Sequence, residues 1–187
     1  SHQSYSIRIP FVGWGMFMMG SIFLERNWQE DQQALFKSFA HLTTYRVPFW
    51  IISYLEGTRV TDSKLAEARK FAQDNQLYVP EMTLIPRVKG FAVMMKELQK
   101  NPDFKYVYDF TFGYCDGIFF NSDFFCRSLR GKKVCVNVKR IPISEIPLND
   151  EVKLKQWLFD RYERKDQMLK KLALAPKDER HFGGEKI

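Results

Sequence analysis

The stretch that decides the fold runs from Phe49 to Arg59 and reads Phe-Trp-Ile-Ile-Ser-Tyr-Leu-Glu-Gly-Thr-Arg. Aromatic and β-branched residues fill its first seven positions, and Pro48 and Gly57 bound them, which predicts a buried strand. The polar residues Glu56, Gly57, Thr58 and Arg59 then stand at the carboxyl end of this strand. Open α/β sheets bind ligands at that end, so the sequence predicts a site there.

A plain structural interpretation of the same four residues is also open. Gly57 can supply an unusual backbone angle at an ordinary strand exit, and Arg59 can lie in solvent. Four residues alone do not separate the two interpretations, because short motifs often match by chance. The rest of the chain has to decide between them.

Size and composition favour one domain with a real core. The chain has 187 residues, and its 45% hydrophobic content, including 17 Phe, is high for a protein with 27% charged residues. Part of this apolar surface is expected to meet a lipid or another apolar partner. The uncharged run from Ile9 to Leu24 is interrupted by Pro10 and by glycines, which favours a buried core or an interfacial segment over a membrane span.

The charge balance favours anionic partners. With 29 Lys and Arg against 22 Asp and Glu, the net charge is +7. Nucleic acids, phospholipid head groups and phosphorylated metabolites are all compatible with that charge. Because no zinc-finger spacing, RNP-like segment or helix-turn-helix pattern is present in the sequence, membrane or phosphate chemistry is preferred, and a nucleic-acid-binding module is the minor alternative.

The three cysteines are predicted to be ordinary free thiols on a cytosol-facing protein. Cys115, Cys126 and Cys135 are an odd number and contain no Cys-x-x-Cys pair. Neither a disulfide framework nor a zinc site is therefore indicated.

Hydrophobic periodicity predicts alternating helices and strands. The expected strands are 49–55, 82–85, 106–112 and 134–138, and the expected helices are 27–43, one from Thr61 or Asp62, 91–100, and a last helix with Leu154, Trp157, Leu158, Tyr162, Leu169 and Leu172 on one face. This order predicts a single α/β domain over residues 1–175, built around a largely parallel sheet. The polar tail 176–187 is predicted to be disordered.

Three motifs occur in an order typical of one family. They are Gly-Ser-Ile-Phe-Leu-Glu-Arg at 20–26, Glu-Gly-Thr-Arg at 56–59 and Leu-Ile-Pro-Arg at 84–87. They resemble the second, third and fourth sequence blocks of the glycerophospholipid acyltransferases, the lysophosphatidic acid acyltransferase family. The Arg-x-Lys-Gly-Phe from Arg87 to Phe91 is similar to the eukaryotic branch that includes the lysophosphatidate and lysocardiolipin acyltransferases.

The first block of that family, His-x-x-x-x-Asp, is matched only in part. His2, in a His-Gln-Ser context, resembles its start, but Ile7 occupies the position of the Asp. The Ile-Pro-x-x-Gly-Trp segment also follows too soon, so the simplest account is a segment missing between about Tyr5 and Ser6, which makes the domain N-terminally incomplete. A degenerate form that has lost the aspartate is the alternative.

The resemblance implies an enzyme that transfers an acyl group from acyl-CoA to lysophosphatidic acid (1-acylglycerol 3-phosphate) and produces phosphatidic acid. It implies no metal, no cofactor beyond acyl-CoA as co-substrate, and a place at the cytosolic face of the endoplasmic reticulum membrane. Lysocardiolipin and lysophosphatidylinositol are the alternative acceptors. A non-catalytic, membrane-binding acyltransferase-like protein is the alternative outside enzymes, and the oligomeric state is left open.

The resemblance also assigns roles to single residues. His2 is the catalytic base, and Glu56, Gly57, Thr58 and Arg59 bind the glycerol phosphate. Arg26, Pro86 and Arg87 lie around the acceptor pocket. The chemistry agrees with these roles, because a phosphate monoester is bound best by planar guanidinium groups that donate two hydrogen bonds at once.

Overall fold

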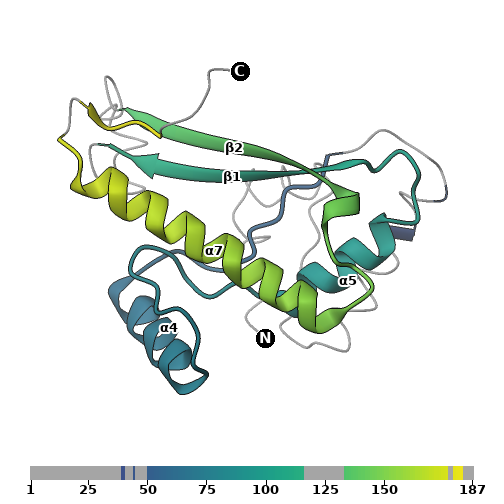
Figure 1. Cartoon of the computed structure of the whole chain (residues 1–187), viewed down its shortest axis with the longest axis horizontal. Helices are drawn as coiled ribbons and strands as arrows, with labels where there is room; N and C mark the ends of the chain where they lie inside the picture. Colours follow the sequence, from purple (N-terminus) through teal and green to yellow (C-terminus); the bar gives the residue numbers. More distant parts are fainter. Residues whose placement is uncertain (1–38, 41–43, 45–49, 116–132, 177–178, 183–187) are drawn as a thin grey trace, which may run out of the picture. The chain divides into compact units, whose positions relative to one another are not determined.

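The computed structural model describes residues 39–40, 44, 50–115, 133–176 and 179–182 (Figure 1). The chain divides into two compact units. The first contains the described residues up to Leu55 together with Arg87–Lys105, and the second contains Glu56–Pro86 and the described residues from Tyr106 onward. The unit boundaries therefore fall between Leu55 and Glu56, between Pro86 and Arg87, and between Lys105 and Tyr106. The first lies at the start of the 56–59 motif and the second lies within the 84–87 motif.

The first unit is built on helix α5 (Val88–Leu98), which begins earlier than the predicted start at Phe91. Phe91, Met95 and Leu98 recur at helical spacing and are all buried, so they form the core face of this helix. Leu98 packs in a cluster with Phe39. The partly buried residues around that cluster are Ile51, Val93, Met94 and Phe104.

The buried strand predicted for 49–55 is wrong over its described part. Residues 50–55 form no strand, and the side chains of Trp50, Ile52 and Tyr54 are about four-fifths exposed. The backbone N–H of Arg87 donates to the carbonyl of Leu55 at 2.8 Å, which ties the end of this stretch to the start of α5. Aromatic and β-branched residues favour extended backbone, but they cannot specify a partner strand, and no strand pairs with this stretch among the described residues.

Helix α4 (Asp62–Asp74) begins the second unit where the sequence predicts it. The hydroxyl of Thr61 accepts the backbone N–H of Lys64 at 3.3 Å, as an N-cap does. Ala68 and Ala72 are buried on its inner face.

The sheet of the second unit is an antiparallel hairpin. Strand β1 (Tyr106–Tyr114) pairs with β2 (Val134–Pro142) in a register that sets Tyr106 opposite Pro142 and Tyr114 opposite Val134. Both strands were predicted, and both extend beyond their predicted ends. The prediction of a largely parallel sheet is wrong, because the described residues contain one sheet and its two strands are antiparallel. The mixture of helices and strands is confirmed.

The strand predicted for 82–85 is also absent, and its backbone donors show why. The N–H groups of Met82 and Thr83 donate to the carboxylate of Asp166 at 2.7 and 2.8 Å, and the N–H of Leu84 donates to Glu56 at 3.3 Å. A backbone donor that is engaged by a side chain is not available to a strand ladder.

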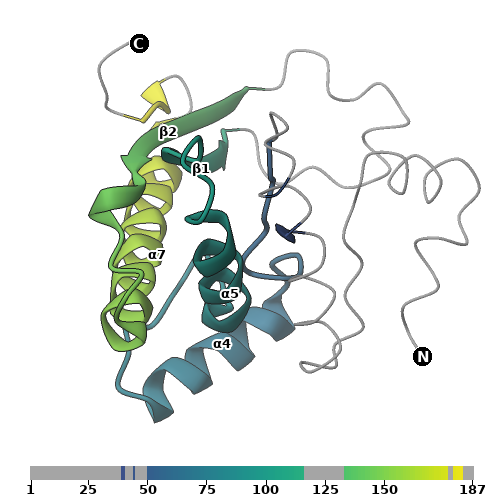
Figure 2. The same ribbon diagram turned by 90° about the vertical axis from the view of Figure 1, so that its right-hand side faces the viewer.

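Helix α7 (Glu151–Leu174) follows β2 after a short 3-10 helix, η1 (Ile143–Glu145). The carboxylate of Asp150 caps α7 by accepting the N–H groups of Val152 and Lys153, both at 3.0 Å. Figure 1 shows α7 running along the β1–β2 hairpin, and Figure 2 shows the same pair from the side. Gly113 of β1 permits this approach, since a Cβ there would collide with the side chain of Leu172.

The apolar face predicted for the last helix is confirmed at Leu154, Leu158 and Leu172, which are buried. The other predicted members of that face are half-buried, namely Trp157, Tyr162 and Leu169. None of the helices in the described part of the chain is both long and apolar enough to span a membrane. The predicted elements 9–24 and 27–43 lie outside the described residues, apart from positions 39 and 40. In the tail, Arg180 donates to the carbonyls of Ala175 and Ala173 at 3.0 and 3.1 Å.

Candidate functional site

Glu56 connects two of the predicted blocks. Its half-buried carboxylate accepts the backbone N–H of Leu84, so the Glu56–Arg59 motif and the Leu84–Arg87 motif are joined directly. Burial raises the pKa of Glu56 above its usual value, while the hydrogen bond from Leu84 and the charge of Lys165 act in the opposite direction. The geometry therefore gives Glu56 a positioning contact within the predicted site.

The residues after Glu56 turn outward. Gly57 has a φ of 68°, a left-handed conformation that glycine adopts without steric cost. Thr58 and Arg59 are exposed, and Arg59 forms no ion pair with any described residue. These features fit both interpretations of the motif, since an exposed guanidinium after a tight turn is equally suited to solvent and to an anionic ligand.

The Leu84–Arg87 motif is held in place by a buried carboxylate on α7. Asp166 has no exposed surface. It accepts the N–H groups of Glu81, Met82 and Thr83 and the hydroxyls of Tyr78 and Thr83, at 2.7 to 3.1 Å. Such a set of donors replaces the water that a buried charge loses. Asp166 thus fixes the segment that leads into Leu84.

Sequence reasoning missed Asp166, although a signal was present. The residue falls at helical spacing after Leu158 and Tyr162, on the face that was predicted to be apolar. An acid at a buried helical position requires a group of donors from elsewhere in the chain. Its presence on that face could have indicated that a loop with free N–H groups packs there.

Two tyrosines near these carboxylates are kept neutral. Burial and the hydrogen bond to Asp166 raise the pKa of Tyr78 to about 12. Burial, followed by the charges of Glu56 and Asp109, raises the pKa of Tyr162 above its usual value. Both phenols are therefore protonated at neutral pH and suited to donate hydrogen bonds rather than to accept a proton from a substrate.

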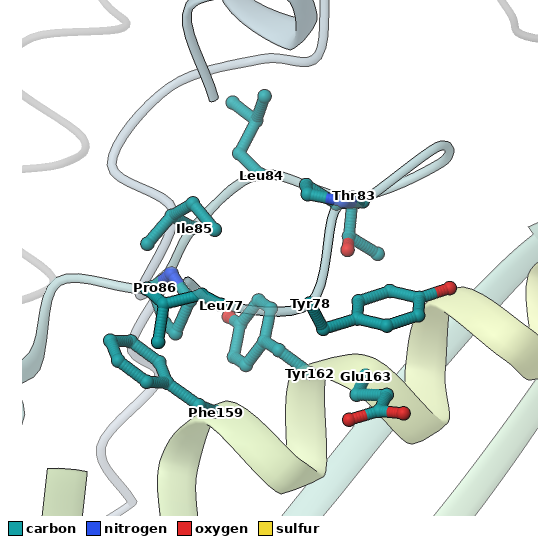
Figure 3. Close-up of a pocket in the computed structure, with 10 residues that line it drawn as sticks. Leu77, Tyr78, Thr83, Leu84, Ile85, Pro86, Phe159, Tyr162 and Glu163 are labelled. Atoms are coloured by element: carbon teal, nitrogen blue, oxygen red, sulfur yellow. The ribbon is translucent and has the colours of Figure 1, made fainter. Parts of the chain in front are cut away.

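The segment before Arg87 and helix α7 enclose a small cavity (Figure 3). Phe159, Tyr162 and Glu163 approach from α7, and Pro86 of the fourth motif lines the opposite side. The other lining residues are Leu77, Tyr78, Pro80, Thr83, Leu84 and Ile85. Its volume of about 30 Å³ corresponds to one water molecule, so this cavity is too small for an acyl chain.

A group of three charges attaches α7 to β1. Asp109 of β1 accepts from Arg161 at 2.7 Å and pairs with Lys165 at 2.5 Å. The three side chains are only 12 to 18% exposed. Lys165 also donates to the carbonyl of Phe110 at 2.8 Å. The same helix that carries Asp166 is thereby fixed to the hairpin.

The other predicted site residues are placed as follows. His2 and Arg26 lie outside the described residues. Arg87 is exposed at the N-cap of α5 and forms no ion pair with the described part of the chain. Among the residues that the structure describes, no group of three or more His, Cys, Asp or Glu side chains could hold a metal ion. The binding roles of Gly57, Thr58, Arg59, Pro86 and Arg87 stay predictions.

The raised pKa of Glu56 predicts a pH effect on stability. The folded state holds this proton more tightly than the unfolded chain, whose pKa is near the ordinary value of 4.5, so ionisation of Glu56 lowers stability as the pH rises above that value. Glu56→Gln removes the titration and keeps an acceptor for Leu84. We expect the free energy of unfolding of the variant, relative to that of the unchanged chain, to increase as the pH is raised from about 4 to about 7. Urea denaturation at each pH measures this difference.

Glu67→Gln serves as the matched control for that comparison, because Glu67 is exposed on α4 and its bond to Lys64 lies in solvent. Its stability profile should run parallel to that of the unchanged chain. A parallel profile for Glu56→Gln would contradict the assignment of the pH effect to Glu56.

Known proteins resemble this chain over most of its length. A family model for the acyltransferase C-terminus matches residues 127–178. The chain is 29% identical to an uncharacterized acyltransferase of Schizosaccharomyces pombe, covering 86% of this chain and 47% of the relative. It is 31% identical to 1-acyl-sn-glycerol-3-phosphate acyltransferase 2 of Arabidopsis thaliana, covering 89% and 42%. It is 34% identical to 1-acyl-sn-glycerol-3-phosphate acyltransferase delta of Mus musculus, covering 84% and 41%.

The chain thus spans less than half the length of these curated relatives. No solved structure matches it. The matches to these relatives cover 84 to 89% of this chain, which carries both the Glu56–Arg59 and the Leu84–Arg87 motifs. The matched C-terminal segment contains α7, the helix that anchors the second of these motifs. Together, these matches and motifs support the glycerophospholipid acyltransferase family for this chain.

Proposed function

We propose that this chain is the acyltransferase portion of an enzyme that converts lysophosphatidic acid to phosphatidic acid with acyl-CoA as donor. The observation that carries the proposal is the contact between Glu56 and Leu84, which joins the third and fourth motifs in one place. The names of the Arabidopsis and mouse relatives favour 1-acylglycerol 3-phosphate as the acceptor.

The proposed reaction needs one base and an acceptor site. His2 takes the proton of the acceptor hydroxyl, and the hydroxyl oxygen attacks the thioester carbonyl of acyl-CoA. An ester bond forms, the carbon–sulfur bond breaks, and the coenzyme leaves as a thiol after receiving the proton. No metal is required by this sequence of steps. A carboxylate that orients His2 is expected in the complete N-terminal block.

The acceptor's phosphate is proposed to meet arginine side chains. Arg59 follows the turn at Gly57, is exposed, and has no anionic partner among the described residues. Two-point hydrogen bonding by a guanidinium suits a phosphate monoester. Arg26 and Arg87 are proposed to complete the acceptor site, at the cytosolic face of the endoplasmic reticulum membrane.

The activity can be tested with membranes that carry the full-length protein. Labelled acyl-CoA is supplied with lysophosphatidic acid, lysocardiolipin or lysophosphatidylinositol in parallel, and the labelled lipid is identified. Labelled phosphatidic acid is the expected product. If another acceptor is preferred, that lipid replaces lysophosphatidic acid in the proposal. If no acceptor gives a product although the transcript encodes an intact His-x-x-x-x-Asp block, the protein is non-catalytic.

Arg59→Lys gives a sharper prediction in the active full-length enzyme. Lysine keeps the charge but loses the planar fork, so acceptor recognition should weaken by about 1 to 3 kcal/mol. We expect KM for lysophosphatidic acid to rise at least several-fold while KM for acyl-CoA stays nearly constant. Arg164→Lys, an exposed position on α7, is the control. A change in KM for acyl-CoA alone would place Arg59 at the coenzyme's phosphates instead.

A further inference from the structure

Two cysteines meet at the open end of the hairpin. Cys135 of β2 lies opposite Gly113, and Cys115 follows β1 directly, where its N–H donates to the carbonyl of Lys133 at 3.2 Å. Positions 113 and 115 face the same side of an extended chain, so the two cysteines are diagonal neighbours on one face. Their sulfur atoms are in contact at 2.6 Å, although the residues are 20 positions apart in the chain.

The two sulfurs are present as thiols in a shared, mostly buried environment. Cys115 is 1% exposed, and Cys135 is only partly buried. The carbonyl of Arg180 lies within reach of both S–H groups, at 3.2 Å from Cys135 and 3.8 Å from Cys115. Burial and the neighbouring thiol raise the pKa of Cys135 to about 11, which keeps it protonated at neutral pH.

We infer that Cys115 and Cys135 form a dithiol modification site, which a small disulfide of the glutathione class oxidises to an intramolecular disulfide. Both described cysteines are free thiols, as predicted, but their proximity was not predicted. The sequence could not indicate it, since the two residues lack Cys-x-x-Cys spacing and meet only through strand register. This site is separate from the acyl-transfer chemistry and does not depend on it.

The reaction proceeds by two thiol–disulfide exchanges. The thiolate of Cys135, the more exposed residue, is the minor form because the pKa is raised, and mildly alkaline pH increases its share. This thiolate attacks one sulfur of the small disulfide, forms a mixed disulfide and releases one thiol. Cys115 then attacks the Cys135 sulfur, the mixed disulfide breaks, and the second thiol leaves. Two protein thiols are oxidised, one external disulfide is reduced to two thiols, and the protons pass to those thiols. Contact between the sulfurs favours the second exchange over accumulation of the mixed disulfide.

The product would connect the end of β1 to the start of β2. Cross-links that close a chain segment of this size restrict the unfolded ensemble, so the oxidised protein should unfold at a higher temperature than the reduced protein. We expect an increase in Tm of several degrees, measured in the absence of added thiol.

The test uses the chain with Cys126→Ser, because no Lys or Arg separates Cys115 from Cys126 and trypsin would leave both in one peptide. The folded protein is incubated with oxidised glutathione at mildly alkaline pH, quenched with acid and digested. We expect peptide 106–127 linked to peptide 134–139, a loss of two hydrogen masses per chain, and reversal by dithiothreitol.

Two comparisons make the result decisive. Cys115→Ser and Cys135→Ser in the same background should yield no internal link and at most one glutathione adduct. In the chain that keeps both Cys115 and Cys135, the ratio of internal disulfide to mixed disulfide should be at least about tenfold higher when the chain is folded than when it is unfolded in urea. Glutathione adducts on both cysteines without a linked peptide, or an equal ratio in urea, would overturn the proposal.

Discussion

Asp166→Ala should lower the free energy of unfolding by about 3 to 5 kcal/mol, the range observed when one partner of a fully buried charged network is removed. The three backbone N–H groups that donate to Asp166 would lose their acceptor, and the N–H of Thr83 would lose it in a buried place. So would the hydroxyls of Tyr78 and Thr83. Unsatisfied buried donors cost about 1 to 3 kcal/mol each, and partial entry of water keeps the total below their sum.

Urea denaturation with two companion variants tests this expectation. Asp166→Asn keeps one carbonyl oxygen and should be intermediate. Asp160→Ala changes an exposed acid on the same helix, whose contact is a bond from Gln156, and should stay within about 0.5 kcal/mol of the unchanged chain. A loss of the same small size for Asp166→Ala would show that the 78–83 segment is held by other contacts.

Asp109→Asn is expected to cost about 2 to 3 kcal/mol. The change leaves Arg161 and Lys165 side by side, each less than one-sixth exposed, without the anion that both contact. Breaking a buried ion pair costs more than the pair contributes, because the remaining charge is left uncompensated. The residual exposure of these groups places the effect below that of Asp166→Ala.

A double-mutant cycle separates this electrostatic effect from simple loss of packing. Asp109→Asn combined with Lys165→Met should cost less than the sum of the two single changes, because one of the stranded cations is gone. Asp103→Asn, an exposed acid outside the cluster, is the control. Strict additivity of the two changes would contradict the proposed coupling between Asp109 and Lys165.

Local patterns predicted the elements whose stability is local. Thr61 or Asp62 indicated the start of α4, and hydrophobic periodicity over 106–112 indicated β1, since capping and side-chain period are properties of neighbouring residues. The sheet type was not predictable in this way. The N–H groups of residues 82–84 bond to two carboxylates, and no sequence period indicates such a choice.

In the candidate site too, motifs of neighbouring residues were predicted, and contacts between residues far apart in the chain were not. Resemblance identified Glu56 and the Leu84–Arg87 motif, and the structure joins them through one hydrogen bond. Asp166, which supports that motif, was missed, because its importance depends on donors far away in the chain. Cys115 and Cys135 were missed as a pair for the same reason, since strand register rather than spacing brings them together.

The position of Asp166 has a consequence for synthesis of the chain on the ribosome. Its partners Tyr78, Glu81, Met82 and Thr83 precede it by 83 to 88 residues. Pairing over such separations requires a long loop to close and is a late event in folding. The segment that leads into the fourth motif therefore emerges from the ribosome long before its acceptor does. A premature stop between Arg87 and Asp166 would yield a polypeptide that carries both motifs but lacks the carboxylate that holds that segment in place.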